Sequence, residues 1–143
     1  MATDIPVTGQ LPQRVVHSPE ETALIAAELL PLMVRAGIVS LEGPLGAGKT
    51  HFVKATARAL GIGDDVTSPT FTLLQSYGSG PSMLHHSDWY RLETPADVLA
   101  LGLEEYEGLM MIEWGDKFAE ILPPGTMRLR IEPHDDGSRW ISW

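Results

Sequence analysis

Gly43-Pro44-Leu45-Gly46-Ala47-Gly48-Lys49-Thr50 is the stretch that decides the fold of this chain. It matches the phosphate-binding pattern G-x-x-x-x-G-K-[ST] at every fixed position. The residues before it, 37–42, are mostly apolar, and the residues after it, 49–60, carry apolar side chains at helical spacing. Strand, glycine loop and helix in this order predict an α/β domain with a site for a nucleoside triphosphate.

The loop carries the groups that hold a triphosphate and its metal ion. Its glycines let the backbone turn tightly and direct N–H groups at phosphate oxygens, beside the positive end of the following helix. Lys49 is expected to reach the β- and γ-phosphates, and the Thr50 hydroxyl is expected to bind Mg²⁺. All residues from Gly43 to Thr50 are therefore predicted to bind the nucleotide.

Hydrolysis or phosphoryl transfer also needs acidic groups near the metal ion. Glu113 ends the most apolar run of the chain, where an acid that contacts Mg²⁺ directly or through water is normally found. Asp88 ends a less apolar run, with His86 on the same face. We treat Lys49, Asp88 and Glu113 as candidate catalytic residues, and Thr50, Glu113 and Asp88 as candidate metal ligands. Either acid could also be an ordinary charged residue at a strand end.

Three further features have both a functional and a structural interpretation. Ser68-Pro69-Thr70 could be a switch-like segment in which a hydroxyl senses the γ-phosphate, or a simple turn into a strand. Trp114 could lie against the nucleotide or pack under the sheet. His85, His86 and Asp88 suggest a transition-metal site, but alternation along a strand leaves only two of them on one face, with no third ligand.

The length and composition of the chain exclude several classes of protein. A chain of 143 residues suits one domain with a single core. A formal charge of −9 opposes direct binding of nucleic acid, which depends on Lys and Arg at phosphates, so any nucleic acid would be held by a partner. Without cysteine there are no disulfides or thiolate metal sites. No apolar run approaches the roughly 18 residues of a membrane span, and no secretory leader is visible, so we expect a cytoplasmic protein.

One domain is expected over residues 12–143, after a flexible N-terminus over residues 1–11. Strands around a phosphate loop are usually parallel, whereas segments joined by short turns form antiparallel hairpins. The expected fold class is α/β: a single P-loop NTPase-like domain with a mixed sheet, parallel at its core and antiparallel in its hairpins, flanked by helices. The expected strands are residues 12–17, 37–42, 70–77, 82–88, 109–113, 127–132 and 139–143.

The first helix has signals at both ends. Ser18 is a predicted N-cap, Pro19 suits the first helical position, and Glu21 completes the pattern of a capping box. Gly37 is expected to end the helix. Pro31 lies inside it and removes an internal hydrogen bond, so the helix should kink or split there.

Several segments together resemble one family, the bacterial TsaE family, the small ATPase of tRNA threonylcarbamoyladenosine biosynthesis. The resemblance spans about residues 15–133 and is far more specific than the phosphate loop alone. The segments, in chain order, are Gly43 to Thr50, Ser68-Pro69-Thr70-Phe71-Thr72-Leu73, His86-Ser87-Asp88-Trp89-Tyr90-Arg91-Leu92 and Ile112-Glu113-Trp114.

The resemblance implies binding and slow hydrolysis of ATP, coupled to a complex of the TsaB and TsaD proteins. In that family, TsaD transfers the threonylcarbamoyl group to the adenosine next to the tRNA anticodon. Carried over by position, Lys49 and Thr50 contact phosphate and Mg²⁺, and Glu113 is a second metal contact. Asp88 is a required acid near the active site, and Trp114 lies close to the nucleotide, ATP or ADP.

The resemblance, applied by position in the same way, also implies that the start of the first helix, around Ser18 and Thr22, approaches the adenine side of the nucleotide. The chain also departs from the family's usual residues at a few positions, none of which supplies a phosphate or metal group. The departures put local packing in question rather than the chemistry. They are Pro31, His51, Ser87 and Trp89.

Two other functions share the phosphate loop. A small-molecule kinase needs a substrate pocket and usually an arginine that gathers charge on the transferred phosphate, for which Arg91 is the well-placed candidate. A nucleotide-dependent binding module would use ATP only to set its shape and partner affinity. Phosphate release measured with and without TsaB and TsaD separates an ATPase from such a module.

Overall fold

The computed structural model describes residues 11–69 and 72–143. The predicted flexible terminus therefore lies, except for its last residue, outside the described residues, and so does Thr70. The helices and strands follow each other as β1 (Gln13–Val16), α1 (Pro19–Ala36), β2 (Ile38–Glu42), α2 (Lys49–Ala59), β3 (Leu74–Tyr77), η1 (Gly80–Ser82), β4 (Leu84–Asp88), α3 (Pro95–Leu99), η2 (Leu103–Glu105), β5 (Leu109–Glu113), η3 (Gly115–Ile121), β6 (Met127–Pro133) and β7 (Arg139–Ser142), where η marks a 3₁₀ helix.

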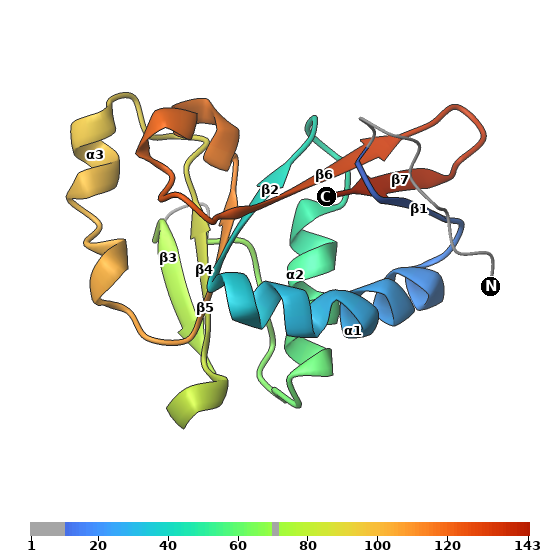
Figure 1. Cartoon of the computed structure of the whole chain (residues 1–143), viewed down its shortest axis with the longest axis horizontal. Coiled ribbons are helices and arrows are strands. Elements are labelled where there is room, and N and C mark those ends of the chain that lie inside the picture. Colours follow the sequence, from blue (N-terminus) through green and yellow to red (C-terminus); the bar gives the residue numbers. More distant parts are fainter. Residues whose placement is uncertain (1–10, 70–71) are drawn as a thin grey trace.

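The strands form one mixed sheet in the order β1-β7-β6-β2-β5-β4-β3 (Figure 1). The four central strands, β6, β2, β5 and β4, are parallel to each other. The outer strands β3, β7 and β1 are antiparallel to their neighbours. The predicted fold class, an α/β domain with a parallel core and antiparallel hairpins, is confirmed.

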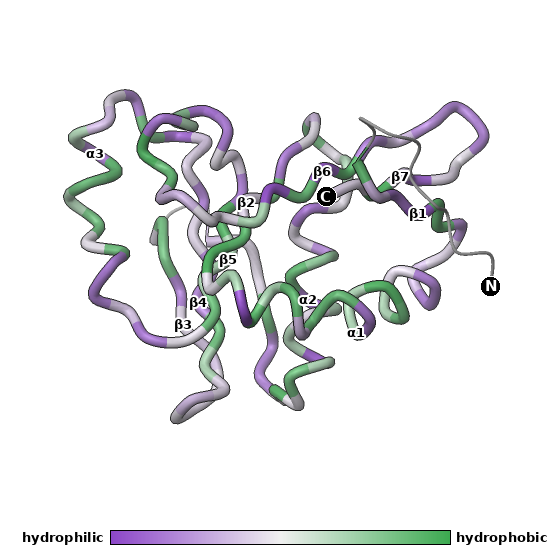
Figure 2. Tube along the Cα trace, viewed as in Figure 1, coloured by the Kyte–Doolittle hydropathy of each residue, from purple (hydrophilic) through white to green (hydrophobic). Residues whose placement is uncertain are grey.

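Helices cover both faces of the sheet, because residues of the central strands alternate between two hydrophobic clusters. On β5, Leu109 and Met111 join the cluster under α1 and α2, whereas Met110 and Ile112 join the cluster under α3 and η3. Figure 2 shows hydrophobic residues along this central strand and hydrophilic residues at the β6–β7 turn. The predicted strand at residues 109–113, buried on both faces, is confirmed.

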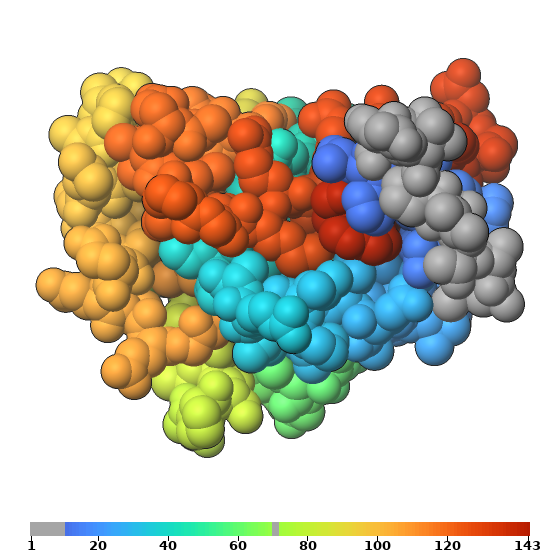
Figure 3. Space-filling model, in the orientation of Figure 1, coloured from blue at the N-terminus to red at the C-terminus, as the bar shows by residue number. Residues whose placement is uncertain are grey.

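α1 begins as predicted but is not interrupted. Ser18 Oγ accepts a hydrogen bond from the Glu21 amide at 3.1 Å, while the Glu21 carboxylate accepts from the His17 amide at 2.7 Å, one residue before the expected partner. The helix continues past Pro31 to Ala36, so the expected split is wrong. Pro31 lies on the exposed side of α1, where water can satisfy the carbonyl that loses its N–H donor. Figure 3 shows this helix, in blue to cyan, at the molecular surface.

Of the strand predicted over residues 70–77, residues 72 and 73 are not in the sheet, and residues 70 and 71 lie outside the described residues. β3 begins at Leu74, because Leu73 adopts a left-handed backbone conformation with φ 65° and leaves the extended path. The Leu73 carbonyl accepts hydrogen bonds from the Ser87 hydroxyl at 2.8 Å and the Asp88 amide at 3.1 Å. Ser87 thus holds this bend against β4. Within the described part of the chain, no helix has the length and apolar character needed to cross a membrane.

Candidate nucleotide-binding site

The phosphate loop lies between β2 and α2, against the backbone of β6. A side chain at Gly43 would overlap the carbonyl oxygen of Ile131 on β6, so only glycine allows the loop to pass there. Gly48, with φ 105°, turns the chain into α2 in a conformation that side chains rarely adopt. The amide groups at this end of α2 therefore face the space beyond the carboxyl ends of the parallel strands.

Lys49 is folded against the loop that precedes it. Its Nζ donates hydrogen bonds to the carbonyl oxygens of Gly43 at 2.7 Å and Pro44 at 2.9 Å, and lies 4.1 Å from the ring centre of Trp114. The side chain is only 5% exposed. Burial lowers the pKa of Lys49 from its ordinary value, an effect opposed first by the nearby Glu113. The ammonium thus lies in a partly desolvated position where an anionic ligand would be strongly attracted.

Glu113 connects three elements through one carboxylate oxygen. Its Oε2 accepts a hydrogen bond from the Thr50 hydroxyl at 2.7 Å and lies 2.6 Å from His86 Nε2. A carboxylate accepts only, so His86 carries its proton on Nε2. His86 is fully buried, and its Nδ1 has no partner among the described residues. The Thr50 hydroxyl donates to Glu113, which leaves its oxygen lone pairs directed away from that carboxylate and available to a cation.

Asp88 lies beside Glu113, because β4 and β5 are parallel and these two strand-end residues are in register. Asp88 Oδ1 accepts a hydrogen bond from the Tyr90 amide at 2.9 Å. Burial raises the pKa of Asp88 above its ordinary value, and the negative charge of Glu113 raises it further. The Tyr90 amide opposes this shift. The second carboxylate oxygen of Asp88 has no recorded partner among the residues that the structure describes.

These groups surround one open cavity of about 470 Å³, which we call the phosphate cavity. Gly43 and Pro44 do not line it; their carbonyl oxygens accept hydrogen bonds from Lys49. Trp114, in a left-handed conformation with φ 63°, lines this cavity and also packs against the hydrophobic cluster under α3 and η3. The lining residues are Leu45, Gly46, Ala47, Gly48, Lys49, Thr50, Ser68, Asp88, Tyr90, Arg91, Glu113 and Trp114.

Only part of the predicted switch-like segment can be described. Ser68 lines the phosphate cavity, and Pro69 is buried with its carbonyl accepting the Leu73 amide at 2.8 Å. Thr70 lies outside the described residues. The sensing of a γ-phosphate by this segment stays a prediction.

The oxygen ligands in the phosphate cavity fit Mg²⁺ bound together with a nucleotide. No group of three or more His, Cys, Asp or Glu side chains that could hold a metal ion is found within residues 11–69 and 72–143. Mg²⁺ is usually held by one or two carboxylate or hydroxyl groups plus substrate phosphates and water, rather than by a complete protein cage. The Thr50 hydroxyl with the carboxylates of Asp88 and Glu113 is such a partial set.

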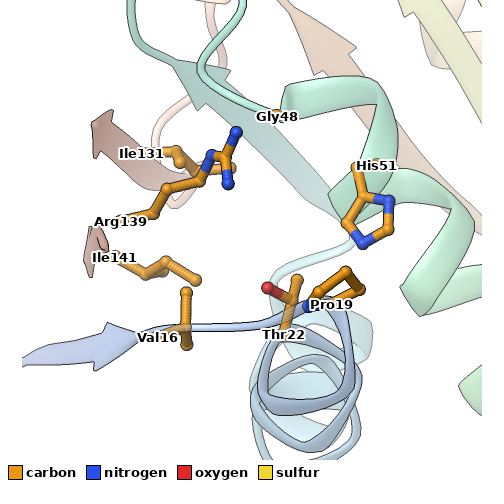
Figure 4. A pocket seen from close by; sticks show the side chains of 8 residues that line it. All are labelled: Val16, Pro19, Thr22, Gly48, His51, Ile131, Arg139 and Ile141. Carbon is orange, nitrogen blue, oxygen red and sulfur yellow. The ribbon is translucent and has the colours of Figure 1, made fainter. Parts of the chain in front are cut away.

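A second cavity of about 270 Å³, which we call the base cavity, lies on the other side of Gly48 (Figure 4). Thr22 and Pro19 of α1 face His51 of α2 across it, and β-strand residues form the remaining wall. Gly48 lines both cavities, so they lie on either side of it. The lining residues are Val16, Pro19, Thr22, Gly48, His51, Ile131, Arg139 and Ile141.

The sequence predicts only some of the residues that line this second cavity. Thr22 was expected there, whereas the Ser18 hydroxyl is occupied in capping α1 and Ser18 is absent from the lining. Ile131, Arg139 and Ile141 were missed as site residues. Their alternation marks them as strand residues, but no local signal tells that their strands return beside the phosphate loop.

Comparisons with known proteins agree on one family. The family model described as threonylcarbamoyl adenosine biosynthesis protein TsaE matches residues 16–141. The chain is 39% identical to the tRNA threonylcarbamoyladenosine biosynthesis protein TsaE of Bacillus subtilis, over 94% of this chain and 85% of that protein. It is 40% identical to the protein of the same name from Treponema pallidum, over 90% of this chain and 96% of that protein.

The fold is also similar to a solved structure. The crystal structure of YdiB from Bacillus subtilis superposes with a TM-score of 0.75 at 33% sequence identity. The match covers 92% of this chain and 83% of that one.

Proposed function

The chain belongs to the TsaE family, whose members act in tRNA threonylcarbamoyladenosine biosynthesis, and on this premise we propose that it is a slow, Mg²⁺-dependent ATPase of that pathway. One observation carries the proposal. The glycine loop, the Lys49 ammonium, the Thr50 hydroxyl and the carboxylates of Asp88 and Glu113 all line or support a single cavity at the carboxyl ends of parallel strands. This is the set of groups that phosphoryl transfer from a nucleotide requires.

We assign the phosphate contacts first. The loop amides and Lys49 would bind the β- and γ-phosphates, for which Lys49 would exchange its bonds to the loop carbonyls for bonds to phosphate oxygens. Thr50 would ligate Mg²⁺, with Glu113 orienting its hydroxyl through the 2.7 Å hydrogen bond. Bound Mg²⁺ neutralises the charge that develops on the phosphate oxygens.

Asp88 is the proposed group that orients the attacking water. Its Oδ1 is held by the Tyr90 amide, and Oδ2 would accept a proton or a hydrogen bond from water in the phosphate cavity. A raised pKa suits a base that works near neutral pH, and its burial supplies that shift.

The base cavity would take adenine, since it lies next to the phosphate cavity across Gly48 and its walls are largely apolar. Thr22 and His51 are the polar side chains that face each other across it (Figure 4). ATP and ADP would share both cavities and differ only in the γ-phosphate.

We further propose that the ATPase acts on a complex of the TsaB and TsaD proteins in the cytoplasm. The formal charge of −9 supports an indirect role toward tRNA, because a protein that meets tRNA through its partners needs no basic surface of its own.

Phosphate release measured with and without TsaB and TsaD tests this function. We expect slow release by the chain alone and faster release with the partners. Asp88→Asn should lose at least about tenfold in hydrolysis while it still binds ADP, since the amide cannot accept a proton. Asp65→Asn, an exposed acid on the far side of α2, is the matched control and should hydrolyse ATP normally. Tight ADP binding with no phosphate release under any condition would favour a nucleotide-dependent binding module instead.

A small-molecule kinase is the second candidate, because Arg91 lines the phosphate cavity. An arginine there could gather charge on a transferred phosphate. Transfer of labelled γ-phosphate to an added metabolite, rather than to water, would support this alternative.

A further inference from the structure

Arg139, at the start of β7, reaches the junction of the two cavities. Its Nε donates a hydrogen bond to the Ala47 carbonyl of the phosphate loop at 2.8 Å. Its side chain also passes over Gly48, where an added Cβ would lie 3.3 Å from Nε. Figure 4 shows the guanidinium directed from the β7 wall of the base cavity toward Gly48.

The bond to Ala47 fixes the orientation of the next amide group. In a planar trans peptide, the carbonyl oxygen of one residue and the N–H of the next point in opposite directions. Because Arg139 holds the Ala47 oxygen on the base side of the loop, the Gly48 N–H is turned to the opposite side, toward the phosphate cavity. Glycine has the freest backbone of all residues, so this is where a loop most needs an external restraint.

The rest of the guanidinium group is available to a ligand. Arg139 is exposed, and neither Nη1 nor Nη2 has a hydrogen-bond partner among the residues that the structure describes. A guanidinium has five N–H donors in one plane, so it can bind a carbonyl through Nε and an anion through its Nη groups at the same time. Lysine can supply the charge but cannot hold both partners in this fixed geometry.

The position of Arg139 is set by the β6–β7 turn and by β1. The Asp136 carboxylate accepts hydrogen bonds from the Ser138 amide at 2.9 Å and from the Ser138 hydroxyl at 2.6 Å, which fixes the turn just before Arg139. Arg139 is in register with Pro133 on β6 and with Val16 on β1. Its backbone is thus held on both sides while its side chain crosses to the loop.

From this geometry we propose that Arg139 is a nucleotide-binding and positioning residue: it turns the Gly48 amide toward the phosphates and binds the phosphate nearest the ribose. The inference rests on the proposed nucleotide site and names the residue that couples its two halves. A nucleotide that fills both cavities would bring its ribose and first phosphate past Gly48, beside the Arg139 guanidinium.

Calorimetric titration with ADP tests the proposal on wild type, Arg139→Gln and Arg139→Lys. Arg139→Gln should weaken ADP binding by about 10- to 100-fold, the usual cost of a lost charge-assisted hydrogen bond. Arg139→Lys should recover part of the affinity through its charge. Arg35→Gln is the matched control, because it removes the same charge at the other end of α1 from the base cavity, and it should bind ADP like wild type.

The amide signal of Gly48 in ¹⁵N-labelled protein gives a readout that overall stability would not change. ADP should shift this signal strongly in wild type and much less in both Arg139 variants, since neither glutamine nor lysine can hold Ala47 and the ligand together. Thermal unfolding of the ligand-free variants should stay within a few degrees of wild type.

Three outcomes would overturn the inference. ADP affinity of Arg139→Gln within twofold of wild type would show that the guanidinium does not contact the nucleotide. Loss of the fold in both variants would show that Arg139 only holds the hairpin. Failure of wild type itself to bind ADP would overturn the proposed function, and this inference with it; the first two outcomes leave that function intact.

Discussion

The phosphate cavity and the base cavity differ in the kind of residues that line them. In the phosphate cavity, charged side chains are held in largely buried positions at the ends of parallel strands, with Lys49, Asp88 and Glu113 each less than 10% exposed. The base cavity has an apolar wall from the antiparallel strands β1 and β7 and from β6, closed by the first turn of α1.

On the proposed assignment, this difference shows how each half of a nucleotide would be recognised. Phosphates need amide groups, an ammonium and a hydroxyl in fixed positions, which one continuous segment of backbone can supply. A base needs mainly a cavity of the right shape, and side chains from any element can line one. The two halves should therefore respond to different substitutions, and ADP compared with inorganic pyrophosphate separates their responses.

The largest loss of ligand affinity is expected when Lys49 is replaced. Lys49→Ala should lower the affinity for both ADP and pyrophosphate by at least about 100-fold, because it removes a buried ammonium from the phosphate cavity. Isothermal titration calorimetry measures this. Lys54→Ala, on the same helix but in another cavity, is the control and should bind both ligands normally. Unchanged ADP binding by Lys49→Ala would mean that the loop is not the phosphate site.

Thr50 and Thr22 offer a matched pair across the two cavities. Thr50→Ala should remove most of the Mg²⁺-dependent part of the ADP affinity, about 10-fold, and have little effect in EDTA. Thr22→Ala should change ADP affinity equally with and without Mg²⁺, since Thr22 lines only the base cavity. Titrations in both buffers check this, and equal Mg²⁺ dependence in the two variants would contradict the division of roles.

Replacing His51 should cause a smaller loss of affinity, and only for ligands that carry a base. His51→Ala is expected to weaken ADP binding by about threefold, the effect of losing one partly exposed contact, and to leave pyrophosphate binding unchanged. Trp114 fluorescence can follow both titrations, because this ring lies on the phosphate cavity. A matching loss for pyrophosphate would show that His51 acts on the phosphates, directly or through its neighbour Thr50.

The smallest effect concerns the stability of the ligand-free protein. The pKa of Asp88 is raised in the folded state, so folding favours its protonated form, and this favourable contribution is lost as the pH rises above the ordinary Asp value of about 3.9. Asp88→Asn should therefore unfold a few degrees higher than wild type at pH 7 and at nearly the same temperature at pH 4. Thermal scans at the two pH values measure it; the opposite trend would mean that the carboxylate is stabilised by its neighbours.

The parts of the fold that the sequence predicted are those fixed by local rules. The glycine loop, the Ser18 cap and the apolar strand that ends at Glu113 each carry their own signal within a few residues. The bend at Leu73 was missed because a leucine in a left-handed conformation is set by its partners on β4, not by its own preference.

The parts of the site that could not be predicted depend on contacts between distant elements. The bond of His86 to Glu113 requires the parallel register of β4 and β5, although the His86 and Asp88 alternation hinted at a shared face. The hydrogen bond from Arg139 to Ala47 joins β7 to the phosphate loop, and no local pattern relates these two segments. The continuity of α1 through Pro31 reflects the exposure of that side of the helix, a tertiary property.

The chain order of the two cavities has a consequence for synthesis on the ribosome. The glycine loop is translated early, but β7, which supplies both Ile141 and Arg139, is translated last among the sheet strands. A nascent chain that still lacks β7 has the loop sequence but neither the wall of the base cavity nor the guanidinium beside Gly48. On the proposed assignment, the complete site for ATP would therefore form only after β7 has joined the sheet.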